Sequence, residues 1–599
     1  MSASRFVGRV GGLAVALGVG AAIYSGVAVA SADTGSAGSS SAASSTGRAA
    51  HGPKASSSTA ARTTKPASAK VSRRAVAAPA AVSVSVTPSG SGGGAPATTD
   101  TPLDLAALAY TRRASLTAAT TAASVAAPLT KPVIMGPSGV PIPSQNYVDG
   151  AISLYINPNY PVDLPPEVLF TPEGLYPITG VKSLPLNTSV DQGIQILTDA
   201  LAKLPDGTPT TVFGYSQSAI ISGLLQGGYT LKINGETTTL TVPSTVADSI
   251  NFVLVGNELN PNGGFLSRFT ATEYSPAVEM PSLGLDFYGA TPQGAYNTTN
   301  YTLEYDGFAD FPRYPLNFLS VLNAGLGIVF VHTKYVPGPN CRTFCTTPDQ
   351  VANALVLPVE PLPGSTAIQD YRFIPTENLP LLEPIRMIPI IGNPIADLVQ
   401  PALKAIVDLG YGDYAHGYGT PDNQPVANVL VPFGLFPAVN PLEVISRIVN
   451  GVGEGIGAFV NDFGPSGSIA RELSAITLPA LPDLTSLALP APGDVLTGIQ
   501  NLVTRVANAI AYSASNLYAG ALPLTDIANA ILTSLPAYDL SLFLGGIKQA
   551  LNGDVIGGLI NAIGLPIAAN VGLITTASLV GGLVFAQAIA GIFGITVGA

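Results

Sequence analysis

Short runs of apolar residues alternate along the middle of the chain with longer segments in which apolar residues recur at helical spacing. The short runs predict buried strands at residues 132–136, 210–213, 250–257 and 301–306. The longer segments predict helices at 189–203 and 217–225, and a helix, alone or running into a strand, at 316–330. Ser189 and Gln192 are spaced as a capping box, which predicts a helix start at Ser189. Apolar strands that alternate with helices indicate an α/β fold with a mostly parallel central sheet.

The pattern changes after residue 418. Residues 419–599 are rich in Leu, Ala, Ile and Gly, are broken by prolines, and carry no Asp, Glu, Lys or Arg beyond residue 554. This composition predicts an apolar, mainly helical region. Residues 571–599 are long enough to approach a bilayer span, and a buried helical hairpin is an equal alternative. We expect this region to hold the protein at a membrane or envelope lipid surface, and truncation near residue 420 to release a soluble, active protein.

The amino terminus has the three parts of an export signal. Arg5 and Arg9 precede an apolar stretch at 10–24, and Ala30-Ser31-Ala32 provides a cleavage site. A membrane anchor is the alternative, but the apolar stretch is short for a span. Residues 33–127 are dominated by Ser, Ala, Thr, Gly and Pro, which predicts a disordered, flexible tether. We therefore expect an exported protein of the cell wall, cell envelope or extracellular space.

Composition narrows the class of protein. The chain has 599 residues, of which 47% are hydrophobic and 11% charged, with a formal net charge of −11. It is too apolar for a wholly disordered protein, and it has no basic stripe for a nucleic acid. Together with the patterns above, the sequence predicts four segments: a signal peptide (1–32), a tether (33–127), an α/β domain (128–418) and the apolar C-terminal region (419–599).

A candidate nucleophile lies where a predicted strand meets a predicted helix. The sequence Gly214-Tyr215-Ser216-Gln217-Ser218 is close to the G-x-S-x-G pattern of the α/β-hydrolase elbow, where small neighbours allow a sharp turn. Ser218 replaces the second glycine but is also small. The alternative is that Ser216 is only a turn residue.

A serine nucleophile needs a histidine base and an acid that orients it, in the chain order serine, acid, histidine. Of the three histidines, His51 lies in the tether, and His332 follows Asp306 and Asp310 at the end of a predicted strand. His416 lies in a Gly- and Tyr-rich loop, which predicts an ordinary surface histidine. The candidate base is therefore His332.

Several motifs in this order resemble the PE-PPE domain of mycobacteria, a serine α/β-hydrolase domain related to cutinases. The motifs are GYSQS at 214–218, YDGFADFPRYPLN at 305–317 and VHTKY at 331–335, and the likeness extends over about 130–415. A signal peptide and tether stand where this family often carries a PE or PPE module.

The resemblance implies a catalytic set. Ser216 would attack an ester carbonyl and His332 would take its proton. Asp310 is preferred as the acid, because a cutinase-like acid comes a few residues beyond the strand, and Asp306 is the alternative. The oxyanion hole would use the backbone N–H of Gln217 and one from the turn after the first strand, at Ser138 or Gly139.

Three functions remain open. The first is an exported serine esterase or lipase-like hydrolase of acyl esters. The second is an acyltransferase that assembles acylated trehalose lipids of the cell envelope, as related domains do. The third is a non-catalytic cell-envelope surface protein. None of these readings calls for a cofactor or a metal.

Cys341 and Cys345 form a C-x3-C pair soon after His332. With no second histidine nearby, the pair makes a poor zinc site. In an exported protein a small disulfide is the better interpretation, and two free thiols are the alternative.

Overall fold

The computed structural model describes residues 129–592, except 234–235, 339–340, 342–344, 421–424 and 476–491. The predicted signal peptide and tether lie outside these residues. The main sheet has seven strands in the order β10-β11-β9-β6-β3-β1-β2, and all neighbouring pairs are parallel except β10 with β11. The strands are β1 (Lys131–Ile134), β2 (Glu167–Val168), β3 (Thr210–Tyr215), β6 (Ile250–Val255), β9 (Asn297–Leu303), β10 (Leu355–Val356) and β11 (Gln369–Ile374). The predicted α/β fold with a mostly parallel sheet is confirmed.

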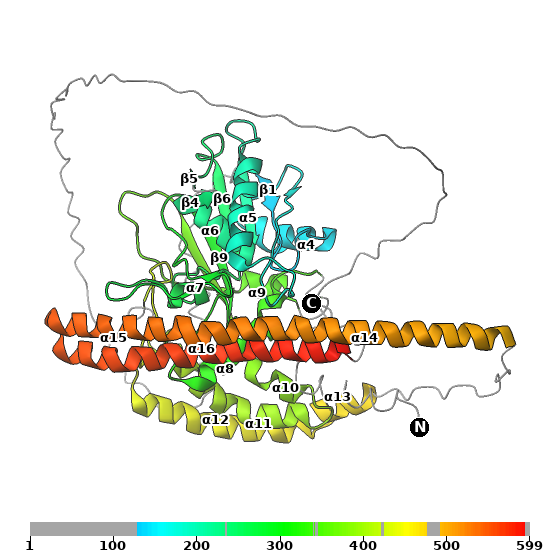
Figure 1. Cartoon of the computed structure of the whole chain (residues 1–599). Helices are drawn as coiled ribbons and strands as arrows, with labels where there is room; N and C mark the ends of the chain where they lie inside the picture. Colours follow the sequence, from blue (N-terminus) through cyan, green and yellow to red (C-terminus); the bar gives the residue numbers. More distant parts are fainter. Residues whose placement is uncertain are drawn as a thin grey trace, which may run out of the picture. The chain divides into compact units, whose positions relative to one another are not determined.

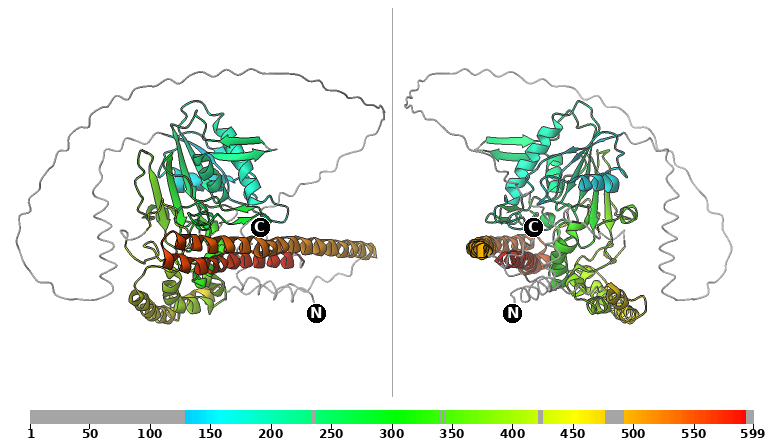
Figure 2. Two further views of the ribbon diagram at one scale, coloured as in Figure 1. Left: turned by 60° about the vertical axis from the view of Figure 1, so that its left-hand side comes forward. Right: turned by 90° about the vertical axis from the view of Figure 1, so that its right-hand side faces the viewer.

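Both faces of this sheet are buried, as the continuously apolar strands require. Val133 and Val212 belong to one hydrophobic cluster, and their neighbours Ile134 and Phe213 belong to another. The first cluster includes helices α5 (Leu186–Leu201) and α6 (Gln217–Gly227), and the second includes α4 (Gln145–Ala151) and the π-helix η1 (Ile152–Ile156). Figures 1 and 2 show helices on both sides of the sheet.

Helix α5 begins three residues earlier than the predicted capping box. Pro185 takes the N-cap position, and Ser189 is fully buried inside the helix. The Ser189 hydroxyl accepts hydrogen bonds from the backbone N–H of Gly174 (2.8 Å) and from the side-chain amide of Gln217 (2.5 Å). The predicted cap is therefore wrong, and Ser189 instead ties α5 to the residue that follows Ser216.

Shorter elements complete the α/β domain. Two hairpins are formed by β4 (Tyr229–Ile233) with β5 (Glu236–Leu240) and by β7 (Glu279–Met280) with β8 (Leu285–Asp286). The helices are α7 (Phe265–Arg268), α8 (Phe318–Phe330), α9 (Pro348–Ala352), α10 (Glu383–Arg386) and α11 (Gly392–Leu409), with 3-10 turns η2 (His332–Lys334) and η3 (Pro380–Leu382). Of the predicted segment 316–330, residues 318–330 thus form a helix, and no part of it is a strand.

The C-terminal region is helical, as predicted. Its helices are α12 (Pro441–Asp462), α13 (Ser468–Ala475), α14 (Pro492–Asn529), α15 (Leu535–Leu551) and α16 (Val555–Ile592), with a π-helical turn, η6 (Ala530–Ser534), between α14 and α15. Helices α14 and α15 follow one another along one continuous rod, and α16 lies alongside both of them (Figures 1 and 2). Gly546 of α15 and Gly558 of α16 allow a close approach, because a Cβ on either glycine would meet the other helix's backbone at 2.3 Å.

These helices also pack on the α/β domain. Ala568, Ala569 and Leu573 of α16 are buried in the same cluster as Phe269, and Phe269 contacts Gly572 so closely that a Cβ there would lie 2.9 Å from the ring. Leu496–Leu551 and Val555–Ile592 are long and apolar enough to cross a membrane by length and composition. One face of the middle of α16 is nevertheless buried against the α/β domain, so the expectation of a separable tail does not fit this packing.

We expect Ala569→Asp to lower the free energy of unfolding by about 3–5 kcal/mol, because it places an unpaired charge in the shared core. Ile567→Asp is the matched control, since Ile567 is 53% exposed on the same helix, and it should change the free energy little. Chemical denaturation followed by circular dichroism measures both. Truncation near residue 420 should likewise give insoluble protein, and a soluble, active truncated chain would contradict this assignment.

Candidate active site

Ser216 occupies a sharp elbow between β3 and α6. Its backbone has φ 58° and ψ −123°, a strained conformation that a non-glycine residue adopts only where the surroundings impose it. Gly214 is required here, since a Cβ would lie 2.5 Å from the carbonyl oxygen of Ser218. The Ser218 hydroxyl accepts from the N–H of Tyr215 (2.8 Å) and donates to its carbonyl (3.0 Å). The serine in place of the second glycine therefore braces the elbow.

His332 lies beside Ser216 and Asp306. It follows α8 and begins η2, and its Nε2 is 2.8 Å from Ser216 Oγ. Its Nδ1 is 2.8 and 2.9 Å from the two carboxylate oxygens of Asp306. All three side chains are buried, and the ring of Phe308 lies edge-on to the imidazole at 4.9 Å. The geometry is a continuous hydrogen-bonded chain from hydroxyl to carboxylate.

Asp306 is held by three further donors. Its carboxylate accepts from the backbone N–H groups of Phe308 (2.9 Å) and Ala309 (3.3 Å) and from the hydroxyl of Tyr335 (2.7 Å). Burial lowers the pKa of His332, but the charge and hydrogen bond of Asp306 outweigh it and leave that pKa raised. An imidazolium formed at His332 is therefore stabilised by its acid partner.

Asp310 does not reach His332, so the preference for it as His332's acid partner is wrong. Its backbone N–H donates to the carbonyl of Asp306 at 2.6 Å, which places Asp310 one turn further on. Its carboxylate accepts from the N–H of Tyr305 (2.8 Å) and contacts His416 Nε2 at 3.0 Å. The turn thus sends two nearby aspartates to two different histidines.

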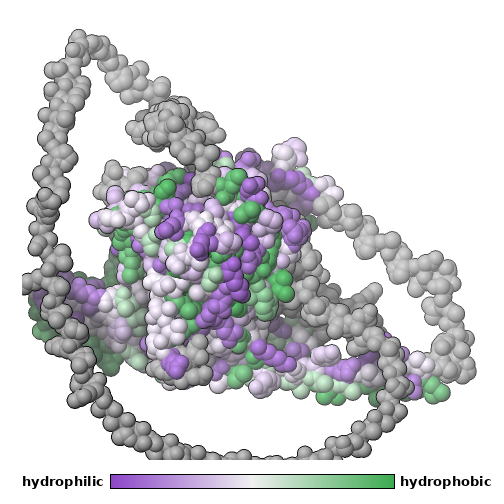
Figure 3. Space-filling model, turned by 90° about the horizontal axis from the view of Figure 1, so that it is seen from above, coloured by the Kyte–Doolittle hydropathy of each residue, from purple (hydrophilic) through white to green (hydrophobic). Residues whose placement is uncertain are grey.

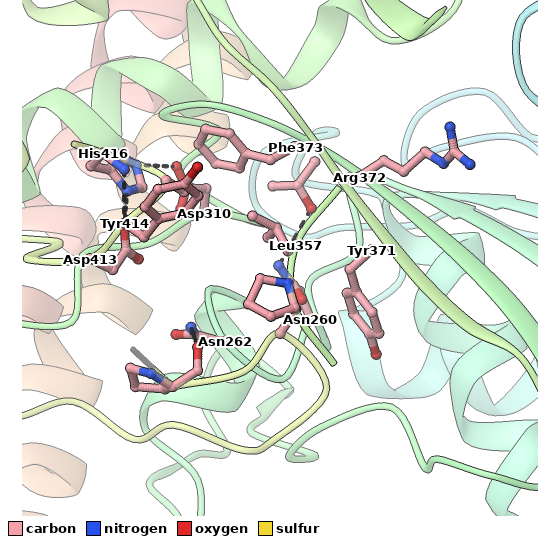
Figure 4. A pocket seen from close by; sticks show the side chains of 15 residues that line it. Asn260, Asn262, Asp310, Leu357, Tyr371, Arg372, Phe373, Asp413, Tyr414 and His416 are labelled. Carbon is pink, nitrogen blue, oxygen red and sulfur yellow. Dashed lines mark hydrogen bonds and ion pairs between the residues drawn. The ribbon is translucent and has the colours of Figure 1, made fainter. Parts of the chain in front are cut away.

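His416 is not a surface histidine. It is 3% exposed, and its Nδ1 lies 2.7 Å from Asp413, so it bridges two carboxylates. Burial lowers its pKa, but Asp310 and Asp413 raise it well above the ordinary value. Figure 4 shows the three side chains on the wall of a cavity of about 40 Å³, whose lining residues do not include Ser216 or His332. The second histidine builds structure around the turn that carries Asp306.

We expect His416→Ala to lower the free energy of unfolding by about 3–5 kcal/mol, because it leaves the buried carboxylate of Asp310 and the partly buried one of Asp413 without their cation. The raised pKa means that the charge of His416 stabilises the fold fully below about pH 6.5 and less as pH rises through the folded-state value. Urea unfolding across pH measures this. Adding Asp310→Asn should restore part of the loss, and no recovery would contradict the ion-pair account.

The predicted oxyanion residues lie around the elbow. Gln217 is the first residue of α6, where backbone N–H groups have no partner within the helix. The hydroxyl of Ser138 donates to the Gln217 side chain at 3.0 Å, which places the turn after β1 beside the elbow. The N–H of Gly139 already donates to the carbonyl of Glu173 at 2.8 Å. Gly139 is therefore engaged elsewhere, and Ser138 is the better second donor.

Glu258 is a site residue that the sequence analysis missed. It follows β6, is 1% exposed, and its Oε1 lies 3.3 Å from Ser216 Oγ. Burial raises its pKa to about 7, against an opposing effect of the His332 charge. Its position just beyond a buried parallel strand was the available signal, since reactive groups gather at that edge of a sheet.

Cys341 and Cys345 form the predicted disulfide, with Cα atoms 5.7 Å apart. The bridge closes the segment that follows His332 and Tyr335. In this region the Tyr335 carbonyl accepts from the hydroxyl of Tyr155 at 2.8 Å.

Comparison with known proteins finds a family model and several relatives that match part of the chain. Residues 163–412 match the PE-PPE domain model. The chain is 44% identical to the uncharacterized PPE family protein PPE28 of Mycobacterium tuberculosis over 76% of this chain and 65% of that protein. It is 38% identical to Esterase PE16 of the same organism, over 56% of this chain and 57% of that protein. The chain thus spans less than two thirds of either relative.

A more distant relative is Diacyltrehalose acyltransferase Chp2 of Mycobacterium tuberculosis, which is 27% identical over 30% of this chain and 49% of that protein. No solved structure matches the chain.

Proposed function

We propose that this chain, whose residues 163–412 are a PE-PPE domain, is a serine hydrolase that acts on acyl esters. The observation that carries the proposal is the buried chain of hydrogen bonds from Ser216 through His332 to Asp306, on the elbow that α/β-hydrolases use for their nucleophile. Esterase PE16 gives independent support as a relative of the same family.

In the proposed reaction, Ser216 Oγ attacks the ester carbonyl while His332 Nε2 takes its proton. His332 then gives the proton to the leaving alcohol, and the acyl group stays on Ser216 until water removes it. Asp306 fixes the imidazole orientation and stabilises its charged form. The backbone N–H groups of Gln217 and Ser138 would bind the oxyanion of the tetrahedral intermediate.

Lipid esters are the proposed substrate class. Large exposed apolar side chains recur along α12, α14 and α16, including Leu442, Ile445 and Val449 of α12, and they suit a lipid-rich surface. Figure 3 shows the α/β domain from another side, where polar and apolar residues are interspersed. We propose an exported, envelope-associated protein, with residues 1–32 as signal peptide and 33–127 as tether.

Acyl transfer to an alcohol is the second candidate. Two relatives are named acyltransferases. The acceptor is tested by supplying an acyl ester labelled in its acyl chain, with and without trehalose, and separating free acid from glycolipid.

We expect the label in free acid if the protein is a hydrolase, and in glycolipid if it is a transferase. A protein that releases no label from short, medium or long acyl esters would support the remaining alternative, a non-catalytic envelope surface protein.

A further inference from the structure

The nucleophile has a second side-chain partner besides His332. Ser216 Oγ lies 3.3 Å from Glu258 Oε1 and 2.8 Å from His332 Nε2, so the hydroxyl sits between a carboxyl group and an imidazole. The backbone of Glu258 is fixed, because its carbonyl accepts from the N–H of Leu266 (3.2 Å) and packs so closely on Gly264 that a Cβ there would lie 2.3 Å away. The backbone from which the carboxyl reaches Ser216 is therefore fixed.

The protonation state of Glu258 decides where the serine proton points. A serine hydroxyl has one proton to donate, and a carboxylate can only accept. An ionised Glu258 would compete with His332 for that proton. A neutral Glu258 can instead donate to Ser216 Oγ and leave the serine proton to His332. Only the second arrangement is ready for attack.

Several charged or titratable groups act on Glu258. His332 and Asp306 belong to the hydrogen-bonded chain that starts at Ser216. Glu173 comes from the segment after β2, and Tyr288 follows β8. Glu173 is also 1% exposed, and one of its carboxylate oxygens has no hydrogen-bond partner among the described residues. Burial of two carboxyl groups in one region disfavours two negative charges there.

We propose that Glu258 is a further catalytic residue, which in its neutral form donates a hydrogen bond to Ser216 and directs the serine proton to His332. This inference rests on the proposed function, and it adds a group that sets the working pH of the same site.

The proposal predicts a bell-shaped dependence of kcat/KM on pH. As pH increases, activity rises when His332 loses its proton and falls when Glu258 loses its own. Because the two groups interact, the two apparent pKa values belong to the pair and not to either residue alone. Burial raises the pKa of Glu258 to about 7 against the opposing charge of His332. His332 has lost that charge on the falling limb, so the falling limb should lie above about pH 7.

The test compares three variants across pH 5 to pH 10 with the same ester. Glu258→Gln keeps a donor and cannot ionise, so the falling limb should disappear and activity at pH 9 should exceed that of the wild type by roughly tenfold. Glu258→Leu removes the donor and should lower kcat/KM at the optimum by roughly ten- to a hundredfold.

Glu173→Gln is the matched control. It removes a neighbouring buried carboxyl that has no hydrogen bond to Ser216 in the structure, so the bell shape should persist. The rate at which a phosphonate labels wild-type Ser216 should follow the same bell, which gives a readout independent of variant folding.

A Glu258→Gln profile that superimposes on that of the wild type would overturn the inference, and so would a fully active Glu258→Leu. In either case labelling of Ser216 would leave the hydrolase proposal standing. A wild type that takes no label would instead overturn the hydrolase proposal itself.

Discussion

Ser216→Ala should lower kcat/KM for short and medium acyl esters by about 10⁴-fold or more and leave the fold intact. The nucleophile is lost, and the remaining rate over the uncatalysed reaction comes only from binding and the oxyanion hole. One oxygen atom is removed from a side chain whose contacts are polar, with His332 and Glu258. The measurement is steady-state hydrolysis, with circular dichroism as the check on folding.

Ser222→Ala is a matched control for this variant. Ser222 lies on the same helix, α6, is equally buried, and donates only to the carbonyl of Ser218 at 2.7 Å. It should keep its activity and its phosphonate label, whereas Ser216→Ala should take none. His332→Ala should be about as damaging as Ser216→Ala, and the double variant no worse, because the residues act as one unit. Full activity in Ser216→Ala would rule out this serine as the nucleophile.

The sheet and the elbow were predictable because their signals are local. Strands buried on both faces must be apolar at successive positions. Val133 and Ile134 of β1 are such a pair, and Val212 and Phe213 of β3 are another. The elbow needs a small residue two positions before the serine, and Gly214 is imposed by the backbone of Ser218. Both features depend on residues within one element or one turn.

The rest of the site depends on distances between elements. Asp306 and Asp310 are four residues apart, and only the turn between them decides which one faces His332. Glu258 reaches Ser216 because β6 is the neighbour of β3 in the sheet. His416 contacts Asp310, which is 106 residues away along the chain. Spacing along the chain carries little information about such contacts.

The C-terminal helices show the same limit for apolar segments. A helix without charges suits both a membrane and a protein interior, so composition left the two alternatives equal for 571–599. The burial of Ala568, Ala569 and Leu573 against the α/β domain comes from tertiary packing. The exposed apolar side chains elsewhere on α14 and α16 are the part that remains available to lipid.

Asp306→Asn should lower kcat/KM by about 10³- to 10⁴-fold, and Asp310→Asn by less than about tenfold. An asparagine at 306 keeps the size of the side chain but loses the charge, so His332 is held in the wrong tautomer and its charged form is no longer stabilised. The pKa of His332, which Asp306 raises, should fall, and the rising limb of the pH profile should move to lower pH.

Asp310→Asn leaves the contacts of His332 and Asp306 in place, and its cost should appear mainly in the free energy of unfolding, because it weakens the pairing with His416. Measuring the pH dependence of kcat/KM and urea unfolding for both variants separates these effects. Equal losses of activity would contradict the assignment of Asp306 alone as the acid partner of His332. A larger loss for Asp310→Asn would favour Asp310, the acid preferred from the sequence.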